Sequence, residues 1–254
     1  MRSGINPIVM GGMLMGLSSC LLAEDNVDGK SQVQVGLVAS VNSSFYRGAD
    51  NDLFVLPLVI AEYGRFYLNG VDAGYRFYQR EDGQRFAIEV GRTFDGYESG
   101  DSSFLSGMAE RKAVWEARIV YEALVGGGRL KGKLMQDISD RHGGFSARLN
   151  YEHLFWQNET TMVTWVTGGE YWDSAKTDYY FGVRDSETRL NRQAYSASEN
   201  LSLFVGSNVI KKLSPNVSLV LSAEYRMAGD AVDESPIVAD GDQWSAYGGI
   251  FYKF

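Results

Sequence analysis

The chain has 254 residues and a formal net charge of −8, and 44% of its residues are hydrophobic. An acidic protein is repelled by the phosphate backbone, so this charge argues against nucleic acid as a partner. Cys20 is the only cysteine and lies near the N-terminus, so no disulfide, cysteine metal site or thiol nucleophile is expected in the mature protein.

The first 23 residues have the pattern of a secretory signal peptide. Arg2 supplies an early positive charge, an apolar stretch from residue 8 to residue 17 follows, and cleavage is expected after Ala23. Residues 17–20 also resemble a lipobox, so lipidation of Cys20 is the alternative. We therefore expect the mature domain to comprise residues 24–254 and to fold in an oxidising compartment.

After Ala23 the sequence contains no apolar run long enough for a membrane-spanning helix. The strongest run covers residues 54–61 and contains Pro57, whereas a spanning helix needs about 20 residues. A secreted chain of this kind can still cross a membrane as a β-barrel, because a closed barrel satisfies every backbone polar group. The composition, with 29 glycines, 15 tyrosines and only 4 prolines, fits a barrel.

Apolar and polar residues alternate in segments of about ten residues, which is the pattern of membrane β-strands. The weaker segments cover residues 33–42, 54–61, 71–78, 85–94, 160–172, 201–210 and 243–254. The clearest cover residues 113–125, 130–138, 145–155 and 217–227. Both chain ends of such a barrel lie in the periplasm, which requires an even number of strands, and residues 65–68 before the Asn69-Gly70 turn supply a short twelfth. We predict an all-β protein, a closed antiparallel transmembrane β-barrel of about 12 strands, with 10 as the alternative.

The connections between these segments alternate in length. Short turns are expected in the periplasm at residues 81–84, 126–128, 156–159 and 211–216. Longer loops are expected outside the cell at residues 43–52, 95–111, 173–198 and 228–242.

The C-terminus carries a sorting pattern. Gly249, Tyr252 and Phe254 are spaced as in the signal by which bacterial outer-membrane barrels are recognised for insertion, although Tyr247 stands where a polar residue is usual. The pattern predicts a location in the bacterial outer membrane. Its expected partners are membrane lipid, lipopolysaccharide and the barrel-assembly machinery.

The same alternation assigns charged side chains to the barrel interior. The candidates for ion pairs in the lumen are Asp72, Arg76, Glu89, Glu116, Arg118, Glu122, Lys131, Lys133, Asp137, Arg148, Glu152, Glu170, Glu224 and Arg226. A selective pore would line its wall with one sign of charge, whereas here acids and bases nearly balance. Since an unpaired buried charge costs several kcal/mol, we expect ion pairs across a largely occluded lumen.

No catalytic, cofactor or metal site is expected. Ser139, His142 and Asp137 or Asp140 supply the residue types of a hydrolase triad, but they all fall within six residues, and a hydrogen-bonded turn is the favoured interpretation. The acidic loops raise the possibility of a divalent ion shared with lipopolysaccharide, without the spacing of a known calcium loop. Their carboxylates belong to Asp95, Glu98, Asp101, Asp230, Asp233, Glu234, Asp240 and Asp242.

Several short motifs, in their order and spacing, resemble the MipA/OmpV family of Gram-negative outer-membrane proteins. They cover residues 46–50, 66–70, 74–77, 136–137 with 142–144, 180–183 and 235–238. The resemblance implies a non-enzymatic scaffold that links a lytic transglycosylase and a murein synthase in cell-wall growth. Its alternatives are a narrow porin-like channel, or a surface adhesin or antigen. A scaffold would bind through its periplasmic turns, where Lys211 and Lys212 are the most exposed charged pair.

Overall fold

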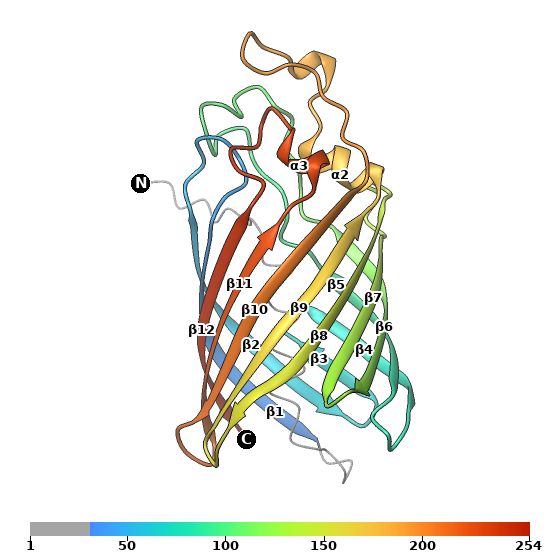
Figure 1. Cartoon of the computed structure of the whole chain (residues 1–254), viewed down its shortest axis with the longest axis vertical. Helices are drawn as coiled ribbons and strands as arrows, with labels where there is room; N and C mark the ends of the chain where they lie inside the picture. Colours follow the sequence, from blue (N-terminus) through green and yellow to red (C-terminus); the bar gives the residue numbers. More distant parts are fainter. Residues whose placement is uncertain (1–30) are drawn as a thin grey trace.

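The structure, a computed structural model, describes residues 31–254, which form a closed antiparallel β-barrel of twelve strands (Figure 1). Each strand pairs with its neighbours in sequence, and β1 pairs with β12 to close the barrel. The prediction of a twelve-stranded antiparallel barrel is confirmed. The predicted signal peptide and Cys20 lie outside the described residues.

The twelve strands are of unequal length, from four residues in β3 to thirteen in β8 and β10. They are β1 (Gln32–Asn42), β2 (Asp52–Tyr63), β3 (Phe66–Asn69), β4 (Asp72–Gln79), β5 (Arg85–Arg92), β6 (Trp115–Val125), β7 (Gly128–Asp137), β8 (Phe145–Gln157), β9 (Thr161–Trp172), β10 (Asn200–Lys212), β11 (Val217–Met227) and β12 (Gln243–Lys253). Strands β8 and β10 extend two residues beyond the expected segments, so the turns that follow them are shorter than predicted.

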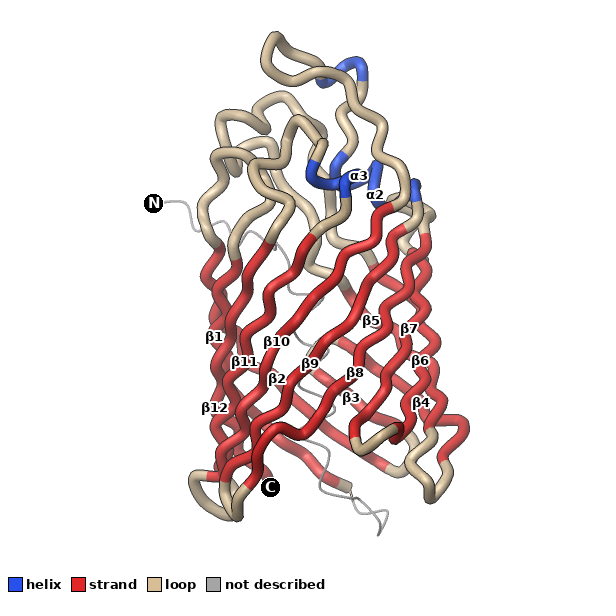
Figure 2. Tube along the Cα trace, in the orientation of Figure 1, coloured by secondary structure: helices blue, strands red, loops and turns tan. Residues whose placement is uncertain are grey.

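Long loops and short helices gather at one end of the barrel, and short turns at the other (Figure 2). The helical segments are α2 (Ser174–Phe181), η1 (Asp185–Glu187) and α3 (Asp230–Asp233). None of the described helices has the length and apolar character needed to cross a membrane. Because outer-membrane barrels carry their long loops outside the cell, the end with α2 and α3 is the extracellular mouth.

Alternation along each strand separates a lipid-facing surface from the lumen. In β6, Ile119 is exposed on the outside, whereas its neighbours Arg118 and Val120 are buried inside. The outer surface carries a belt of exposed apolar side chains that includes Val35, Leu37, Leu53, Val55, Ile88, Leu134, Leu149, Trp165, Leu203, Leu221 and Ile250. The belt gives the barrel the apolar exterior that a bilayer requires.

The closing seam between β1 and β12 contains the predicted sorting residues. Gly249 pairs with Val38, and a Cβ at Gly249 would lie 2.7 Å from a Val38 methyl group, so the close approach requires glycine. The rings of Tyr252 and Phe254 face the outside with their centroids 5.0 Å apart. Their role as a sorting signal remains a prediction.

One side of the lumen is apolar. The inner apolar cluster consists of Val38, Leu58, Ile60, Ile210, Val220, Tyr247 and Phe251, which project inward from β1, β2, β10, β11 and β12. The sequence analysis assigned only charged residues to the lumen and did not identify this cluster. It also explains why the alternation is weak in β2, because both faces of that strand are apolar.

The inner apolar cluster should contribute strongly to stability. Phe251 is 1% exposed, so Phe251→Ala leaves a cavity and should lower the free energy of unfolding by about 3–5 kcal/mol. Its neighbour Ile250 is 54% exposed on the lipid side, and Ile250→Ala should cost about 1 kcal/mol or less. Urea-induced unfolding of the refolded barrels in detergent measures both. Equal losses of unfolding free energy in Phe251→Ala and Ile250→Ala would show that the inner apolar cluster does not stabilise the fold.

Candidate functional site

The extracellular loops pack into a compact cap over the barrel mouth. This loop cap has an apolar core built from Phe45, Tyr46, Tyr97, Leu105, Met108, Tyr180, Phe181, Val183, Val232, Ile237 and Val238. These residues come from four loops, so each loop is held by the others. The sequence predicted a long external loop at residues 173–198, but it did not predict this apolar core.

Three of the short motifs that carry the family resemblance meet in the loop cap. The Tyr46 hydroxyl donates a hydrogen bond to the Tyr180 carbonyl at 3.4 Å, and the Ser235 hydroxyl donates to the Phe181 carbonyl at 2.6 Å. The Arg47 amide donates to the Ile237 carbonyl at 2.9 Å. Motifs almost 200 residues apart in sequence therefore form one structural unit.

A buried ion pair holds two loops together inside the cap. Arg111 contacts Glu187 with an N–O distance of 3.0 Å, and both side chains are almost fully buried. Glu187 also accepts a hydrogen bond from the Ala109 amide at 2.9 Å. Arg192, which is fully buried, donates to the Glu187 carbonyl and to the Phe104 carbonyl. The charged side chains of Glu187 and Arg192 are therefore used to hold the loop at residues 173–198 in place.

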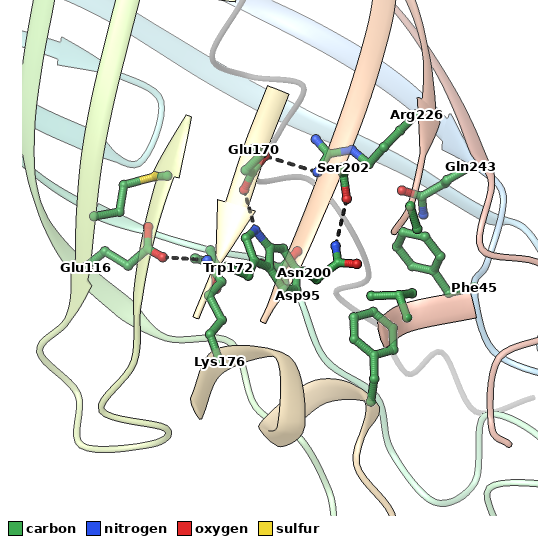
Figure 3. Close-up of a pocket in the computed structure, with 15 residues that line it drawn as sticks. Phe45, Asp95, Glu116, Glu170, Trp172, Lys176, Asn200, Ser202, Arg226 and Gln243 are labelled. Atoms are coloured by element: carbon green, nitrogen blue, oxygen red, sulfur yellow. Dashed lines mark hydrogen bonds and ion pairs between the residues drawn. The ribbon is translucent and has the colours of Figure 1, made fainter. Parts of the chain in front are cut away.

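Helix α2 places a lysine inside the barrel mouth (Figure 3). Asp173 precedes the helix and is its N-cap residue. The Asp173 carboxylate accepts a hydrogen bond from the Lys176 amide at 2.9 Å and so caps the first turn of the helix. The Lys176 ammonium points into the lumen, 3.1 Å from Glu116 and 3.0 Å from the Ser146 hydroxyl. It also lies 4.5 Å from the centre of the Trp172 ring. Lys176 thus joins the loop cap to the barrel wall.

Below Lys176, two arginines and two glutamates form a closed ion cluster. Arg148 contacts Glu170 at 3.0 Å and Glu224 at 2.9 Å, and Arg226 contacts the same two carboxylates at 3.0 and 3.2 Å. The guanidinium of Arg148 lies 3.8 Å from the centre of the Phe204 ring. Because Arg148 is on β8 and Glu224 is on β11, these ion pairs connect strands that are not neighbours.

A second set of charges follows strands β4 to β7. Arg118 contacts Asp72 at 2.8 Å and Glu116 at 3.0 Å, so it links to Lys176 through Glu116. Further pairs are Lys133 with Glu89, Lys131 and Arg129 with Glu122, and Arg76 with Glu62. Ion pairs across the lumen were predicted, but most of these contacts join nearby strands along the wall.

Two candidates have other roles. Glu152 accepts hydrogen bonds from Thr164 at 2.8 Å and Asn208 at 3.4 Å. Asp137 contacts no lysine or arginine side chain among the described residues, because its carboxylate binds the turn that follows β7. Glu62 and Lys176 were not predicted as ion-pair residues. Glu62 lies near the end of β2, where both faces of the strand are apolar, and Lys176 lies in a loop helix.

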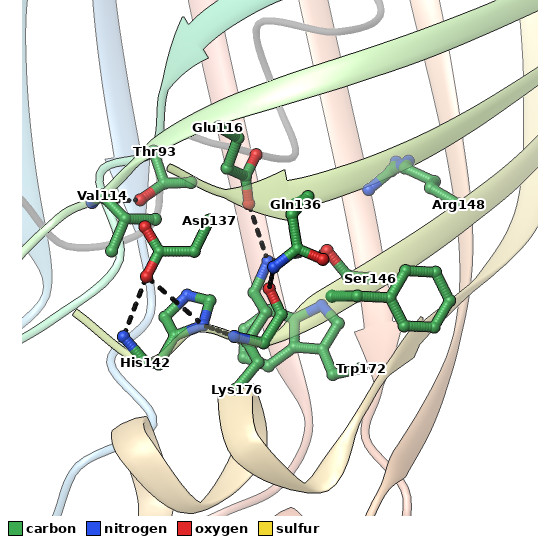
Figure 4. A network of polar contacts seen from close by, with 12 residues as sticks. Thr93, Val114, Glu116, Gln136, Asp137, His142, Ser146, Arg148, Trp172 and Lys176 are labelled. Atoms are coloured by element: carbon green, nitrogen blue, oxygen red, sulfur yellow. Dashed lines mark hydrogen bonds and ion pairs between the residues drawn. The ribbon is translucent and has the colours of Figure 1, made fainter. Parts of the chain in front are cut away.

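The turn after β7 has no triad geometry (Figure 4). The Ser139 hydroxyl donates to Asp137 at 2.7 Å, and His142 Nδ1 accepts from the Gly144 amide at 2.8 Å. His142 therefore makes no hydrogen bond to Ser139 that could activate the serine hydroxyl as a nucleophile. Burial, together with nearby Lys176, lowers the pKa of His142 and favours its neutral form. The interpretation as a hydrogen-bonded turn accounts for all three residues.

The acidic loops use their carboxylates locally. Asp101 accepts from the Glu98 amide at 2.8 Å, Asp233 accepts from the Gly241 amide at 3.1 Å, and Asp242 accepts from the Tyr225 hydroxyl. Within residues 31–254, no three histidine, cysteine or acidic side chains come together in a way that could hold a metal ion.

A small cavity lies between the loop cap and the ion cluster (Figure 3). Its volume of about 30 Å³ matches one or two water molecules and no larger solute. It is lined by Phe45, Thr93, Asp95, Glu116, Met135, Glu170, Trp172, Lys176, Phe181, Asn200, Ser202, Arg226, Ala228, Val232 and Gln243. Burial raises the pKa of Asp95 to about 6, although Lys176 opposes the shift.

Comparison with known proteins identifies relatives over most of the chain. The family model described as "MltA-interacting protein MipA" matches residues 35–254. Outer membrane protein Omp26La of Vibrio anguillarum is 27% identical over 158 residues, which are 62% of this chain and 61% of that protein. The chain thus matches less than two thirds of that relative's length.

Two relatives from Escherichia coli K12 match over more of their length. Putative outer membrane protein YiaT is 24% identical over 88% of this chain and 92% of its own. MltA-interacting protein is 23% identical over 82% of this chain and 85% of its own. The names of these relatives describe outer-membrane or interacting proteins.

Removing the ammonium of Lys176 should release α2 from the barrel. Lys176→Met leaves Glu116 without one of its two partners, and breaking a buried ion pair costs about 3–5 kcal/mol. Chymotrypsin cleavage at the buried Tyr180 and Phe181 should therefore become faster by on the order of a hundredfold. Lys112→Met, which removes an exposed lysine of the mouth, is the control. Equal protection in both variants would refute an anchoring role for Lys176.

Asp95 should make stability depend on pH. Its pKa is 3.8 in an unfolded chain and about 6 in the folded protein, so the folded state retains this proton between those values. The contribution of Asp95 therefore favours folding at low pH and is lost as pH rises towards 6. Asp95→Asn removes this titration. The melting temperature of the variant relative to the parent should therefore rise by a few degrees as the pH is raised from 4 to 7. Melting curves in detergent test this, and a pH-independent difference would contradict it.

Proposed function

The chain belongs to the MipA family of outer-membrane β-barrels, and on that premise we propose that it is a non-enzymatic docking protein of the bacterial outer membrane. It holds a murein hydrolase of the lytic transglycosylase class, together with a murein synthase, against its periplasmic rim. One relative is named for an interaction with another protein, "MltA-interacting protein", which supports a docking role.

The filled lumen carries this proposal. Most of the charged side chains that face the lumen from β4 to β11 form ion pairs, and the inner apolar cluster covers the opposite wall. The cavity at the mouth is the size of one or two water molecules. A barrel occupied in this way supports a function at its rims better than flow of solute through its centre.

The periplasmic rim is pre-shaped for binding. In the turn between β10 and β11, the Ser214 hydroxyl accepts from the Val217 amide at 3.1 Å, and the Asn216 amide group donates to the Lys253 carbonyl at 2.8 Å. Lys211 and Lys212 are exposed beside this turn. A rigid rim loses little conformational entropy on binding, which favours affinity.

The loop cap favours recognition outside the cell as a second candidate function. A groove of about 620 Å³ opens on its surface, lined by Arg141, His142, Ala175, Asp178, Tyr179, Gly182, Val183, Arg184, Asp185, Ala194, Tyr195 and Ser196. An ordered external surface with both signs of charge suits an adhesin or antigen. Loss of host-cell binding after deletion of residues 184–193 would support this candidate.

The docking proposal is tested by crosslinking in cells, affinity purification of the barrel and mass spectrometry. A lytic transglycosylase or a murein synthase should be enriched. Lys211→Glu with Lys212→Glu should reduce that enrichment by roughly tenfold, because charges at the rim of an interface control association. Lys112→Glu, a charge reversal at the opposite end of the barrel, should have no effect.

Two outcomes would contradict docking. Recovery of only lipopolysaccharide and assembly machinery would remove the proposed partners. A large, steady single-channel conductance of the purified protein in a planar bilayer would show an open lumen and favour the porin-like alternative.

A further inference from the structure

The barrel wall is incomplete between β2 and β5. Strand β2 pairs with β1 along its whole length, from Asp52 to Glu62, but β3 pairs with β2 only between Ile60 and Tyr63. Strand β4 begins at Asp72 and reaches β5 no further than Val90. Among the described residues, no strand pairs with the second edge of residues 52–58. The short β3–β4 hairpin therefore leaves an opening towards the extracellular side.

The backbone of β2 is directed into this opening. The Gly70 amide donates to the Val59 carbonyl at 2.9 Å, so the polar groups of Val59 point away from β1. Alternate residues of a strand share this direction, which assigns the same orientation to Leu53, Val55 and Pro57. Pro57 has no N–H group, and proline is tolerated at an edge for that reason. Its position is itself a sign that this edge is unpaired.

The opening has a defined frame, which we call the lateral window. Its floor is the Asn69-Gly70 turn, its sides are residues 53–58 of β2 and the end of β5, and its upper border is the loop that carries Tyr97. The Tyr97 ring packs on Tyr46 of the β1–β2 loop with 4.7 Å between centroids. Two strands are missing above the floor, so ideal strand spacing puts the backbones of β2 and β5 about 14 Å apart. Leu58 behind this gap is only 4% exposed, so side chains cover it.

The window opens at the depth of the membrane hydrocarbon. On its rim, Leu53 is 72% exposed and Val55 is 57% exposed. The adjacent strand contributes Leu37, which pairs with Pro57 and also faces outward. The side chains of residues 53–58 on this rim carry no charge, whereas the β5 side ends at the exposed Arg92. Because it occupies the extracellular half of the wall, the window faces the outer leaflet.

Behind the window the lumen is apolar rather than polar. Leu58 and Ile60 belong to the inner apolar cluster, and Leu56 and Phe94 pack against it. The neighbours of Phe94, Thr93 and Asp95, line the mouth cavity instead. Phe94 therefore points away from that cavity and packs against the inner apolar cluster, between the cluster and the membrane. Membrane barrels usually have a polar interior, so an apolar region beside a gap in the wall calls for an apolar occupant.

We propose that the lateral window admits the alkyl chain of an outer-leaflet lipid, which lies against Phe94 and the inner apolar cluster. A docked β-strand would fit less well, because Pro57 leaves only the amides of Leu53 and Val55 as donors along this edge. An alkyl chain instead fits the exposed apolar side chains that β2 offers along this rim, Leu53 and Val55. This binding site is independent of the periplasmic docking function, and either can fail without the other.

The test is photolabelling of the whole mature protein in liposomes whose phospholipid carries a diazirine on its alkyl chain. Peptide mapping should find label on the inward-facing Leu56 and Leu58 and on Phe94. Val120 is the matched control, since it is inward-facing and as buried as Leu58 but lies behind the fully paired strands β5, β6 and β7. The lipid-facing Val55 and Ile119 should both be labelled and confirm insertion.

A second arm uses a free diazirine fatty acid in unlabelled liposomes. Label on the inward-facing residues in the first arm identifies a membrane lipid as the source. Label on these residues in the second arm alone identifies a free fatty acid and overturns the membrane source. Label confined to outward residues in both arms, or equal label on Val120 and Leu58, would overturn the proposal.

Substitution of Phe94 tests the passage itself. Phe94→Ala should increase the label on Leu58 several-fold, because the smaller side chain leaves the window open. Phe94→Trp, which keeps an aromatic ring at this position and preserves packing, should decrease it. Unchanged labelling of Leu58 in a folded Phe94→Trp protein would show that the chain does not pass Phe94.

Discussion

A chain in a bilayer must satisfy its own backbone hydrogen bonds, and the rest of this structure depends on that constraint. Twelve strands meet it by closing on one another, with β12 returning to β1. Closure directs every second side chain inward, where each group must find a partner within the protein. The seam between β2 and β5 is the place where the constraint is relaxed, and Pro57 lies on that edge.

The side chains buried in the lumen are stabilised in two ways. On one side, apolar side chains such as Phe251 and Ile60 pack against each other. On the other side, Arg148 and Arg226 share the carboxylates of Glu170 and Glu224. Charge neutralisation matters more there than the position of any one pair, because a buried charge without a partner is costly. Together, the two halves leave little space for solute and direct attention to the rims and to the lateral window.

The loop cap shows why short, separate motifs can identify a family. Tyr46, Phe181 and Val238 lie in different loops, yet they form one apolar core over the mouth. Lys176 then connects that core to Glu116 on the barrel wall. A change in one loop therefore affects the packing of the others, which explains how motifs far apart in sequence share one structural role.

Alternation with a period of two, together with turn signals, was sufficient to predict a membrane barrel of twelve strands. These signals are local, so they can be read along the chain without knowing which strands meet. Only the tertiary structure decided that Arg148 pairs with Glu224 three strands away and that Lys176 enters the lumen from a loop helix. It also decided that no described strand pairs with the second edge of residues 52–58 in β2. Each depends on the register and curvature of the closed barrel, which no segment of ten residues encodes by itself.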